Sequence, residues 1–351
     1  MTELPAVLDG HNDSLLALRR ASADPSVFRD GHAGGDLDLP RAREGGLAAG
    51  LFAIFVPSED RFGPERARSD TADGYRIERP PPLSPAAARR VTDDLIGVFD
   101  AITGFDGVRK CTTVDDLRAC VDGDELGAVL HFEGSEAIAP DLSNFEAYYD
   151  RGLRSLGPAW SRPTQFADGV PFRYPSGPDC ADGLTDAGRR LVERCDDRGV
   201  LVDCAHLASE GFWDVHEVST NPLVVSHAAA HGVCPLSRNL TDDQLDAVAD
   251  TGGVVGLTFA ANALRPDGEN DPEVPLSVVV EHVDYLVDRM GVDHVALGSD
   301  FDGATVVDSI GDAAGLPTLF TALRDAGYSQ RDLRKLAHEN WLRVLDAVWA
   351  S

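Results

Sequence analysis

Lysine is nearly absent from this 351-residue chain: only Lys110 and Lys335 occur, and arginine supplies the other cationic side chains. Acidic residues number 59 against 31 basic ones, which gives a formal net charge of −28. Such a charge repels nucleic acid and anionic membranes, so we expect neither among the partners. A GC-rich genome explains arginine in place of lysine but not the acidity, which favours the hypothesis of a protein adapted to concentrated salt.

Long apolar runs are missing as well. The longest, Leu51–Val56, is far shorter than the roughly 20 residues that a membrane-spanning helix needs. The first residues contain no basic segment followed by an apolar stretch, and the last contain no hydrophobic tail. We therefore expect no signal peptide, no lipid anchor and a cytoplasmic location.

Closely spaced cysteine pairs are also absent, because none of the six cysteines stands in a Cys-x-x-Cys motif. In a cytoplasmic chain, a scattered set of this kind is more typical of reduced core thiols than of disulfides or a thiolate zinc site. We therefore expect the six thiols to be free.

The chain does contain a regular alternation of short apolar, β-branched runs with longer segments of helical period. This alternation is typical of βα units around a parallel sheet. Eight strands are predicted: Ala6–Asp9, Leu47–Val56, Gly127–Phe132, Arg154–Ala159, Val200–Ala205, Pro222–Ser226, Gly253–Phe259 and His294–Gly298. Together they favour an α/β protein with one closed (β/α)₈ TIM barrel, formed by residues 1–351 as a single domain.

Capping residues predict where several helices begin. Ser84-Pro85 precedes a helix that ends at Ile102, and Ser329 with Asp332 resembles a capping box ahead of one last helix. Further caps are predicted at Thr185, Ser209, Thr241 and Ser277.

Long irregular stretches follow four of the predicted strands: Pro57–Leu83, Ser161–Leu184, Ala260–Leu276 and Phe301–Leu316. In a barrel, all four would gather as long βα loops at the C-terminal face. That face is where the active sites of such barrels form.

The first chemical signal is the segment Asp9-Gly10-His11-Asn12-Asp13. His11 and Asp13 are two residues apart just past the first predicted strand, so an extended backbone points both side chains the same way. This brings one imidazole and one carboxylate to a common centre. A lone His-x-Asp is weak evidence for a metal, and the interpretation depends on the other candidates.

The same kinds of side chain recur where other predicted strands end. The third, fifth, sixth and eighth strands are followed within one or two residues by Glu133, His206, His227 and Asp300. Each alone is better explained as a polar loop residue. Three histidines and three carboxylates that project into one mouth of a barrel indicate a common site.

This set of ligands suits two divalent metal ions. Imidazole and carboxylate without thiolate favour Zn²⁺, with Mn²⁺ or Co²⁺ as alternatives. Glu133 can bridge, so that one ion takes His11, Asp13 and Glu133 and the other takes Glu133, His206 and His227. Three protein ligands per ion leave positions open for a shared water or hydroxide, as catalysis requires.

Three further carboxylates have possible roles near the ligands. Asp300, outside the ligand set, is the candidate for moving a proton to and from the reacting water. Asp9 and Asp203 are candidates for orienting the ligand histidines.

The order of these motifs resembles the renal (membrane) dipeptidase family of the amidohydrolase superfamily. The matching elements run through the whole chain: Asp9-Gly10-His11-Asn12-Asp13, Glu133-Gly134, Asp203-Cys204-Ala205-His206, Ser226-His227, Ser237-Arg238-Asn239, Ser299-Asp300-Phe301-Asp302-Gly303 and Glu339-Asn340-Trp341-Leu342-Arg343-Val344-Leu345. Collectively they are specific, although no single motif is.

The resemblance implies a binuclear zinc site and hydrolysis of dipeptides, in some members with a D-residue on the C-terminal side. It implies that Asp300 activates the bridging water and that Arg238 engages the substrate carboxylate or the developing oxyanion, which a guanidinium fork suits. A homodimer is a further expectation taken from the family.

One position departs from the family pattern. A histidine that holds the substrate carbonyl in the eukaryotic dipeptidases corresponds here to Trp160, whose indole donates one hydrogen bond but cannot be cationic. Trp160 is therefore a candidate substrate-binding residue, and the substrate stays open.

Two alternatives remain beside a dipeptidase. The first keeps the metals but cleaves another small amide, an ester or a phosphoester. The second is a non-catalytic barrel that binds metal or a small ligand, although the full ligand set with Asp300 speaks against it.

Overall fold

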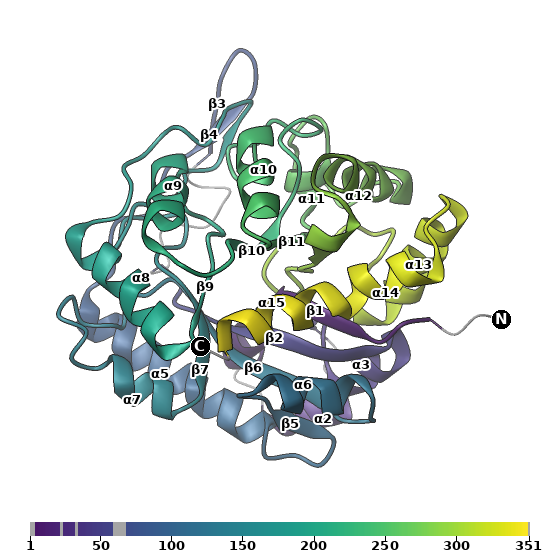
Figure 1. Ribbon diagram of the computed structural model, residues 1–351, viewed down its shortest axis with the longest axis horizontal. Helices are drawn as coiled ribbons and strands as arrows, with labels where there is room; N and C mark the ends of the chain where they lie inside the picture. The colour runs from purple at the N-terminus through teal and green to yellow at the C-terminus, as the bar shows by residue number, and fades with distance from the viewer. Residues whose placement is uncertain (1–3, 22–23, 32–33, 59–67, 350–351) are drawn as a thin grey trace.

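A closed barrel of parallel strands forms the centre of the computed structural model, which describes residues 4–21, 24–31, 34–58 and 68–349 (Figure 1). The strands follow one another around the barrel in the order β10 (Val224–Ala228), β11 (Val254–Leu257), β12 (Val295–Leu297), β1 (Val7–Asn12), β2 (Leu47–Phe55), β6 (Leu126–Glu133), β7 (Leu153–Gly157) and β9 (Leu201–Val202). A parallel bridge between Asp203 and Val224 joins β9 to β10. An additional strand, β5 (Val108–Lys110), pairs with the start of β6.

Each of the eight predicted strands corresponds to one barrel strand, which confirms the TIM-barrel prediction. Two boundaries differ in ways that affect the site. His11 lies inside β1 rather than just past it. The strand β9 is only two residues long, because the Asp203 carboxylate accepts the N–H of Ala205 and turns the chain out of the sheet.

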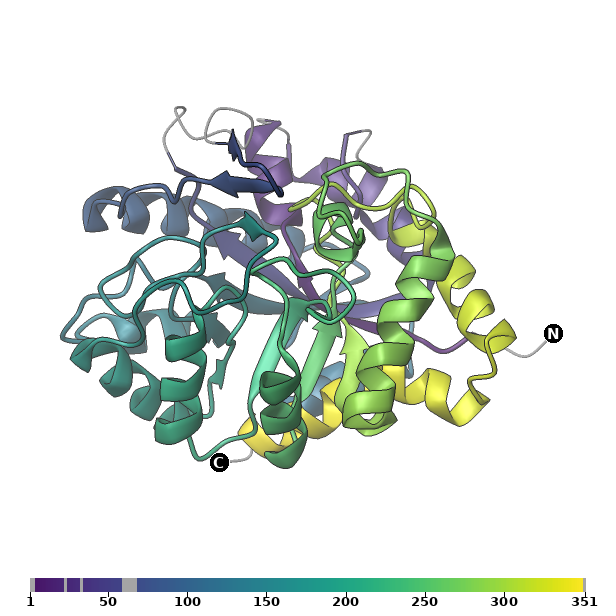
Figure 2. The ribbon, with the colours of Figure 1, turned by 90° about the horizontal axis from the view of Figure 1, so that it is seen from above.

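Helices surround the barrel in both ribbon views (Figures 1 and 2). They are α1 (Ser14–Arg20), α2 (Ser26–Asp30), α3 (Leu39–Gly45), α5 (Pro85–Ile102), α6 (Val114–Val121), α7 (Phe145–Asp150), α8 (Asp186–Arg198), α9 (Ser209–Val218), α10 (Asp242–Asp250), α11 (Ala261–Leu264), α12 (Leu276–Met290), α13 (Leu316–Asp325), α14 (Gln330–Arg334) and α15 (Asn340–Trp349). Two 3₁₀ turns are formed by Val292–His294 and Ala313–Gly315.

The last helix closes the end of the barrel opposite the candidate site. Trp341 and Val344 on α15 pack with Leu8, Leu51 and other apolar side chains from the strands. The indole N–H of Trp341 donates to the carbonyl of Leu297 at 2.9 Å. Burial of this apolar face holds α15 across the barrel and leaves the other end open for polar side chains.

The predicted caps are confirmed at Ser84, Thr185, Thr241 and Ser329, and wrong at two positions. Helix α9 already includes Ser209, whose N–H donates to Pro178, and Ala208 is its cap. Helix α12 begins after Pro275, so Ser277 lies within its first turn. The predicted last helix is helical throughout from Gln330 to Trp349, and a π-helical turn over Lys335–Glu339 lies between α14 and α15.

Two of the loops predicted to be irregular contain strands. β3 (Arg68–Asp70), β4 (Tyr75–Ile77) and β8 (Arg173–Tyr174) form a small antiparallel sheet beside the barrel mouth (Figure 2). Stacking of the Tyr75 and Tyr174 rings, 6.0 Å apart, sets its register. The strands are two or three residues long, too short to show an alternating pattern in the sequence.

All six cysteines are free, and five of them are buried. Among the described residues, no helix is both long and apolar enough to cross a membrane.

Candidate metal and active site

The six strand-end residues meet at the open end of the barrel. They form three overlapping groups, and within each group the possible ligand atoms lie within 4.8 Å of one another. The groups are His11–Asp13–Glu133, Glu133–His206–His227 and His11–His227–Asp300. All five expected ligands are buried; His11, Glu133 and His227 lie on barrel strands, and Asp13 and His206 lie just beyond them.

Glu133 stands at the centre of this arrangement. Its Oε1 lies 3.0 Å from Nε2 of His206 and 3.6 Å from Nε2 of His227. Its Oε2 lies 3.7 Å from Nε2 of His11, which in turn lies 3.4 Å from Oδ2 of Asp13. The two carboxylate oxygens thus face two separate groups of ligands, as a bridging carboxylate must.

The electrostatics of the site favour bound cations. Burial lowers the pKa of His206 and His227 far below its ordinary value, so both imidazoles are neutral and can act as ligands. Burial also lowers the pKa of His11, but the carboxylate of Glu133 and the other acidic groups outweigh this effect and raise it to about 10. Nδ1 of His11 has no partner among the described residues. The donor set therefore fits divalent cations.

A chain of hydrogen bonds fixes the tautomer of His227. The Ser226 hydroxyl donates to Oδ2 of Asp203 at 2.5 Å and lies 2.8 Å from Nδ1 of His227. Because the hydroxyl has one proton, Nδ1 of His227 must donate to it, which leaves the lone pair on Nε2 facing Glu133. Asp203 therefore reaches His227 through Ser226. A second serine, Ser161, contacts Nδ1 of His206 at 2.8 Å.

The carboxylate of Asp9 binds the segment that precedes Asp300. Its carboxylate accepts the N–H of Ser299 at 2.6 Å and the Ser299 hydroxyl at 2.8 Å, and it makes no hydrogen bond to the His11 ring. The same hydroxyl lies 3.0 Å from the carbonyl of His11. Asp9 thus holds the segment that carries Asp300 and also contacts the backbone of His11, and its role in orienting a ligand histidine stays a prediction.

Asp300 is held in a left-handed backbone conformation, with φ of 63°, at the turn after β12. Its N–H donates to the carbonyl of His11 at 3.0 Å. A Cβ at Gly303 would lie 2.4 Å from its Oδ1 and 2.2 Å from Oδ2 of Asp13, so this turn requires glycine. Burial raises the pKa of Asp300 to about 7, although bound cations would lower it again.

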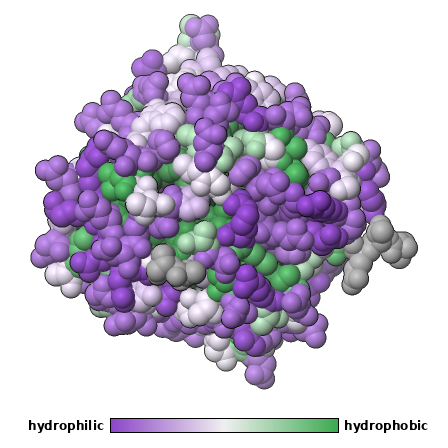
Figure 3. Space-filling model, viewed as in Figure 1, coloured by the Kyte–Doolittle hydropathy of each residue, from purple (hydrophilic) through white to green (hydrophobic). Residues whose placement is uncertain are grey.

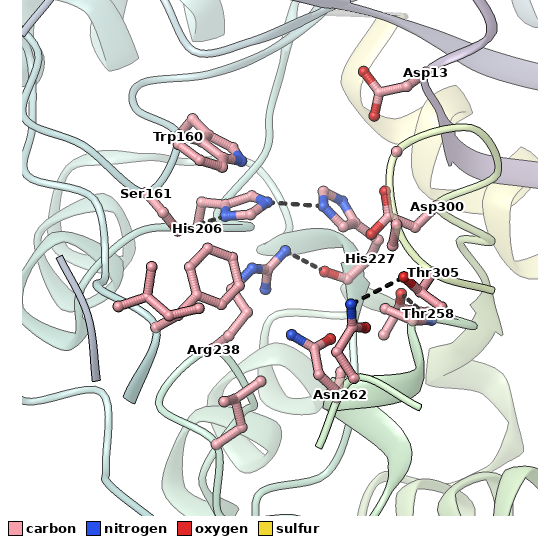
Figure 4. A pocket seen from close by; sticks show the side chains of 18 of the residues that line it. Asp13, Trp160, Ser161, His206, His227, Arg238, Thr258, Asn262, Asp300 and Thr305 are labelled. Carbon is pink, nitrogen blue, oxygen red and sulfur yellow. Dashed lines mark hydrogen bonds between the residues drawn. The ribbon is translucent and has the colours of Figure 1, made fainter. Parts of the chain in front are cut away.

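A cavity of about 680 Å³ opens in front of these residues. Arg238, which is buried, donates through Nη2 to the carbonyl of His227 at 2.6 Å and lines the cavity with its remaining donors (Figure 4). Trp160 lies on the other side, with its ring 4.9 Å from that of Phe55 and 5.7 Å from that of His206. The cavity therefore presents a cation and an indole beside the ligand cluster.

Several residues of the site escape prediction from the sequence. The sequence indicates Ser226 only through the motif Ser226-His227. No sequence motif indicates Ser161 or the cavity-lining residues Thr258, Asn262 and Thr305. Their roles depend on side-chain contacts between distant segments. Such contacts are not encoded in a local pattern.

Comparisons with known proteins agree with this geometry. The profile of the membrane dipeptidase family (peptidase family M19) matches residues 1–350. An uncharacterised protein of Klebsiella pneumoniae, in the pqqA 5′ region, is 45% identical over 242 residues, which are 69% of this chain and 89% of that protein.

Two solved structures are similar over nearly the whole chain. A metallopeptidase from Rhodobacter sphaeroides, liganded with a phosphinate mimic of the dipeptide L-Ala-D-Ala, is 42% identical with a TM-score of 0.95. The dipeptidase AC, also a metallopeptidase, is 43% identical with a TM-score of 0.92. In each case the match covers 99% of this chain and 100% of the other.

The barrel and the histidine–carboxylate cluster at its mouth define a metal-dependent enzyme of the amidohydrolase-like fold. Within that class, the chain belongs to the membrane dipeptidase family, peptidase family M19, whose members with similar structures are metallo-dipeptidases.

Proposed function

We propose that this protein hydrolyses small dipeptides with two divalent metal ions, most suitably Zn²⁺, at the mouth of the barrel. The observation that most strongly supports this proposal is that the two carboxylate oxygens of Glu133 face two separate groups of ligands. The dipeptide mimic bound by the Rhodobacter sphaeroides relative supports a dipeptide, including one with a D-residue on the C-terminal side.

The metal ligands in this proposal come from five residues. His11, Asp13 and Glu133 would hold one ion, and Glu133, His206 and His227 would hold the other. Bound ions of this kind acidify a water and polarise a carbonyl oxygen. Ser161 and Ser226 contact Nδ1 of His206 and of His227 and so help to orient the two rings.

Asp300 moves the proton in this reaction. It lies within 4.8 Å of the ligand atoms of His11 and His227 but outside the two groups that contain Glu133. From this position its carboxylate takes a proton from the attacking water and returns it to the leaving amine.

Arg238 and Trp160 hold the substrate. The guanidinium of Arg238 is fixed by the carbonyl of His227 and keeps donors free for the C-terminal carboxylate of a dipeptide. The indole N–H of Trp160 makes no hydrogen bond with any described residue and faces the site (Figure 4), where it can donate to the oxygen of the scissile carbonyl.

The decisive experiment combines elemental analysis for metal with hydrolysis of L,L and L,D dipeptides by wild type and Asp300→Asn. We expect near two ions per chain in both proteins, and kcat lower by about 10²- to 10⁴-fold in the variant. Loss of metal together with activity would show that Asp300 is a ligand instead.

The same panel separates the alternatives. If the protein binds two ions and hydrolyses small esters or other amides but no dipeptide, the proposed metal site is correct and the proposed substrate is wrong. If the protein binds two ions but hydrolyses no amide, ester or phosphoester, it is a non-catalytic protein that binds metal or a small ligand, and the proposal is overturned.

A further inference from the structure

Asn262 lines the cavity with a side chain that makes no hydrogen bond to any described residue. It belongs to α11, the short helix that follows β11 at the barrel mouth, and it is half-buried. Only its backbone carbonyl has a partner, the Sγ of Cys234 at 3.5 Å. A half-buried carboxamide with free donors and a free acceptor in a substrate cavity is available to a ligand.

The position of Asn262 relative to Arg238 is rigidly set. The amide of buried Asn239, next to Arg238, donates to the carbonyls of Cys234 and Ala263 at 2.9 and 2.8 Å. These bonds join the loop that carries Arg238 to the helix that carries Asn262. Both side chains therefore face the cavity from the same wall (Figure 4).

Uncharged polar side chains lie near Asn262 on this wall, and the cavity is also lined by Ala260, Ala263 and the carboxylates of Glu269 and Asp271. Thr258 and Thr305 also line it, and Asn270 donates to Oγ1 of Thr305 at 2.9 Å. The opposite wall is aromatic, with Trp160 packed between Phe55 and Phe172. The two walls thus offer different environments to the two side chains of a dipeptide.

We propose that Asn262 recognises the side chain of the C-terminal residue of the substrate and selects neutral hydrogen-bonding groups, namely hydroxyls and carboxamides. The inference rests on the proposed function. Because Arg238 and Asn262 line the same wall, a dipeptide whose C-terminal carboxylate is held by Arg238 can place the side chain of that residue against Asn262.

The charge and polarity of the wall argue against other side chains. An acidic side chain would meet the carboxylates of Glu269 and Asp271, and Arg68, which also lines the cavity, is already paired with Glu269 at 2.8 Å. An aliphatic side chain would cover the Asn262 amide and leave its donors unpaired, which disfavours binding. We expect discrimination of about tenfold to a hundredfold between such substrates.

The test compares kcat/KM for Ala-Asn, Ala-Ser, Ala-Leu and Ala-Asp, each with both stereoisomers of the second residue, in competition in one reaction. Wild type should prefer Asn and Ser over Leu and Asp. Asn262→Leu, which keeps the side-chain size, should lower the Asn-over-Leu ratio at least tenfold. Asn221→Leu, at a site that contacts Asp196 outside the cavity, should keep the wild-type ratio.

The outcomes distinguish this inference from the function on which it rests. A wild type that hydrolyses none of these or other dipeptides overturns both. Hydrolysis with the same ratio in Asn262→Leu as in wild type overturns only the role of Asn262, and a preference for Asp overturns the neutral selectivity. Should Asn262→Leu fail to fold, Asn262→Ala should move the ratio in the same direction.

Discussion

The lone pair of His227 is directed by two residues, Asp203 and Ser226, that do not line the cavity. The Asp203 carboxylate accepts a hydrogen bond from the Ser226 hydroxyl, and this hydroxyl in turn accepts a hydrogen bond from Nδ1 of His227. Both residues are buried, so water does not compete for these bonds. The preference of the site for a cation therefore depends on a serine hydroxyl as well as on the ligands themselves.

We predict that Ser226→Ala weakens metal binding by about 10- to 100-fold, because Nδ1 of His227 loses its acceptor and the ring loses its fixed tautomer. Titration of the metal-free protein with Zn²⁺ against a competing chelator measures the change. Ser143→Ala, at an exposed serine that contacts Asp141, is the matched control. Equal affinity in both variants would contradict the role of Ser226.

Trp160 differs from a histidine because its donor does not titrate. We predict that Trp160→Phe, which keeps the ring packing against Phe55, lowers kcat by about 10²- to 10³-fold, as expected for loss of one oxyanion donor. Trp160→His should restore part of the rate and add a pH dependence near the pKa of an imidazole. A Trp160→Phe variant with wild-type kcat would limit Trp160 to packing.

At the scale of the elements, Arg162 connects the segments that follow three barrel strands through hydrogen bonds. Its Nε donates to Oε1 of Glu136 at 2.6 Å, and its other nitrogens donate to Ser58 and to the carbonyl of Val56. The segments involved follow β2, β6 and β7, the strands beside Glu133 and Trp160. Neither side chain of the Arg162–Glu136 pair is exposed by more than 2%.

Loss of one partner from this pair should strongly destabilise the fold. We predict that Arg162→Met costs about 3–5 kcal/mol, because it leaves the Glu136 carboxylate buried without its cation. Arg118→Met at the exposed pair with Asp115 should cost no more than about 1 kcal/mol. Urea unfolding of both variants tests the difference, and similar midpoints would show that the buried pair is not needed for stability.

The sequence predicts these elements to different degrees. Most barrel strands are predictable because they are short, largely apolar runs, and the ligands because they stand at or near the ends of such runs. The small sheet of Arg68–Asp70, Tyr75–Ile77 and Arg173–Tyr174 depends on ring packing between distant loops and has no local pattern. The same holds for Ser161 beside His206, since 45 residues separate them.

At the scale of the whole molecule, the surface is dominated by charge. Hydrophilic side chains cover most of the face shown in Figure 3, and the net charge of the chain is −28. Many arginines are already engaged in exposed ion pairs with aspartates or glutamates, such as Arg68 with Glu269 and Arg151 with Asp93. Such pairs neutralise only part of the excess, because acidic residues outnumber basic ones 59 to 31.

The remaining carboxylates repel one another, and this repulsion destabilises the compact state in dilute buffer. Salt screens it, with a Debye length that falls from about 10 Å at 0.1 M to about 3 Å at 1 M. We therefore predict that the thermal unfolding midpoint rises steadily from dilute buffer to molar KCl. Sorbitol at equal osmolality is the control, since it changes water activity without screening charge. A midpoint that is equal in dilute buffer and molar KCl would contradict salt adaptation, because repulsion between the carboxylates would then not destabilise the folded chain even without screening by salt.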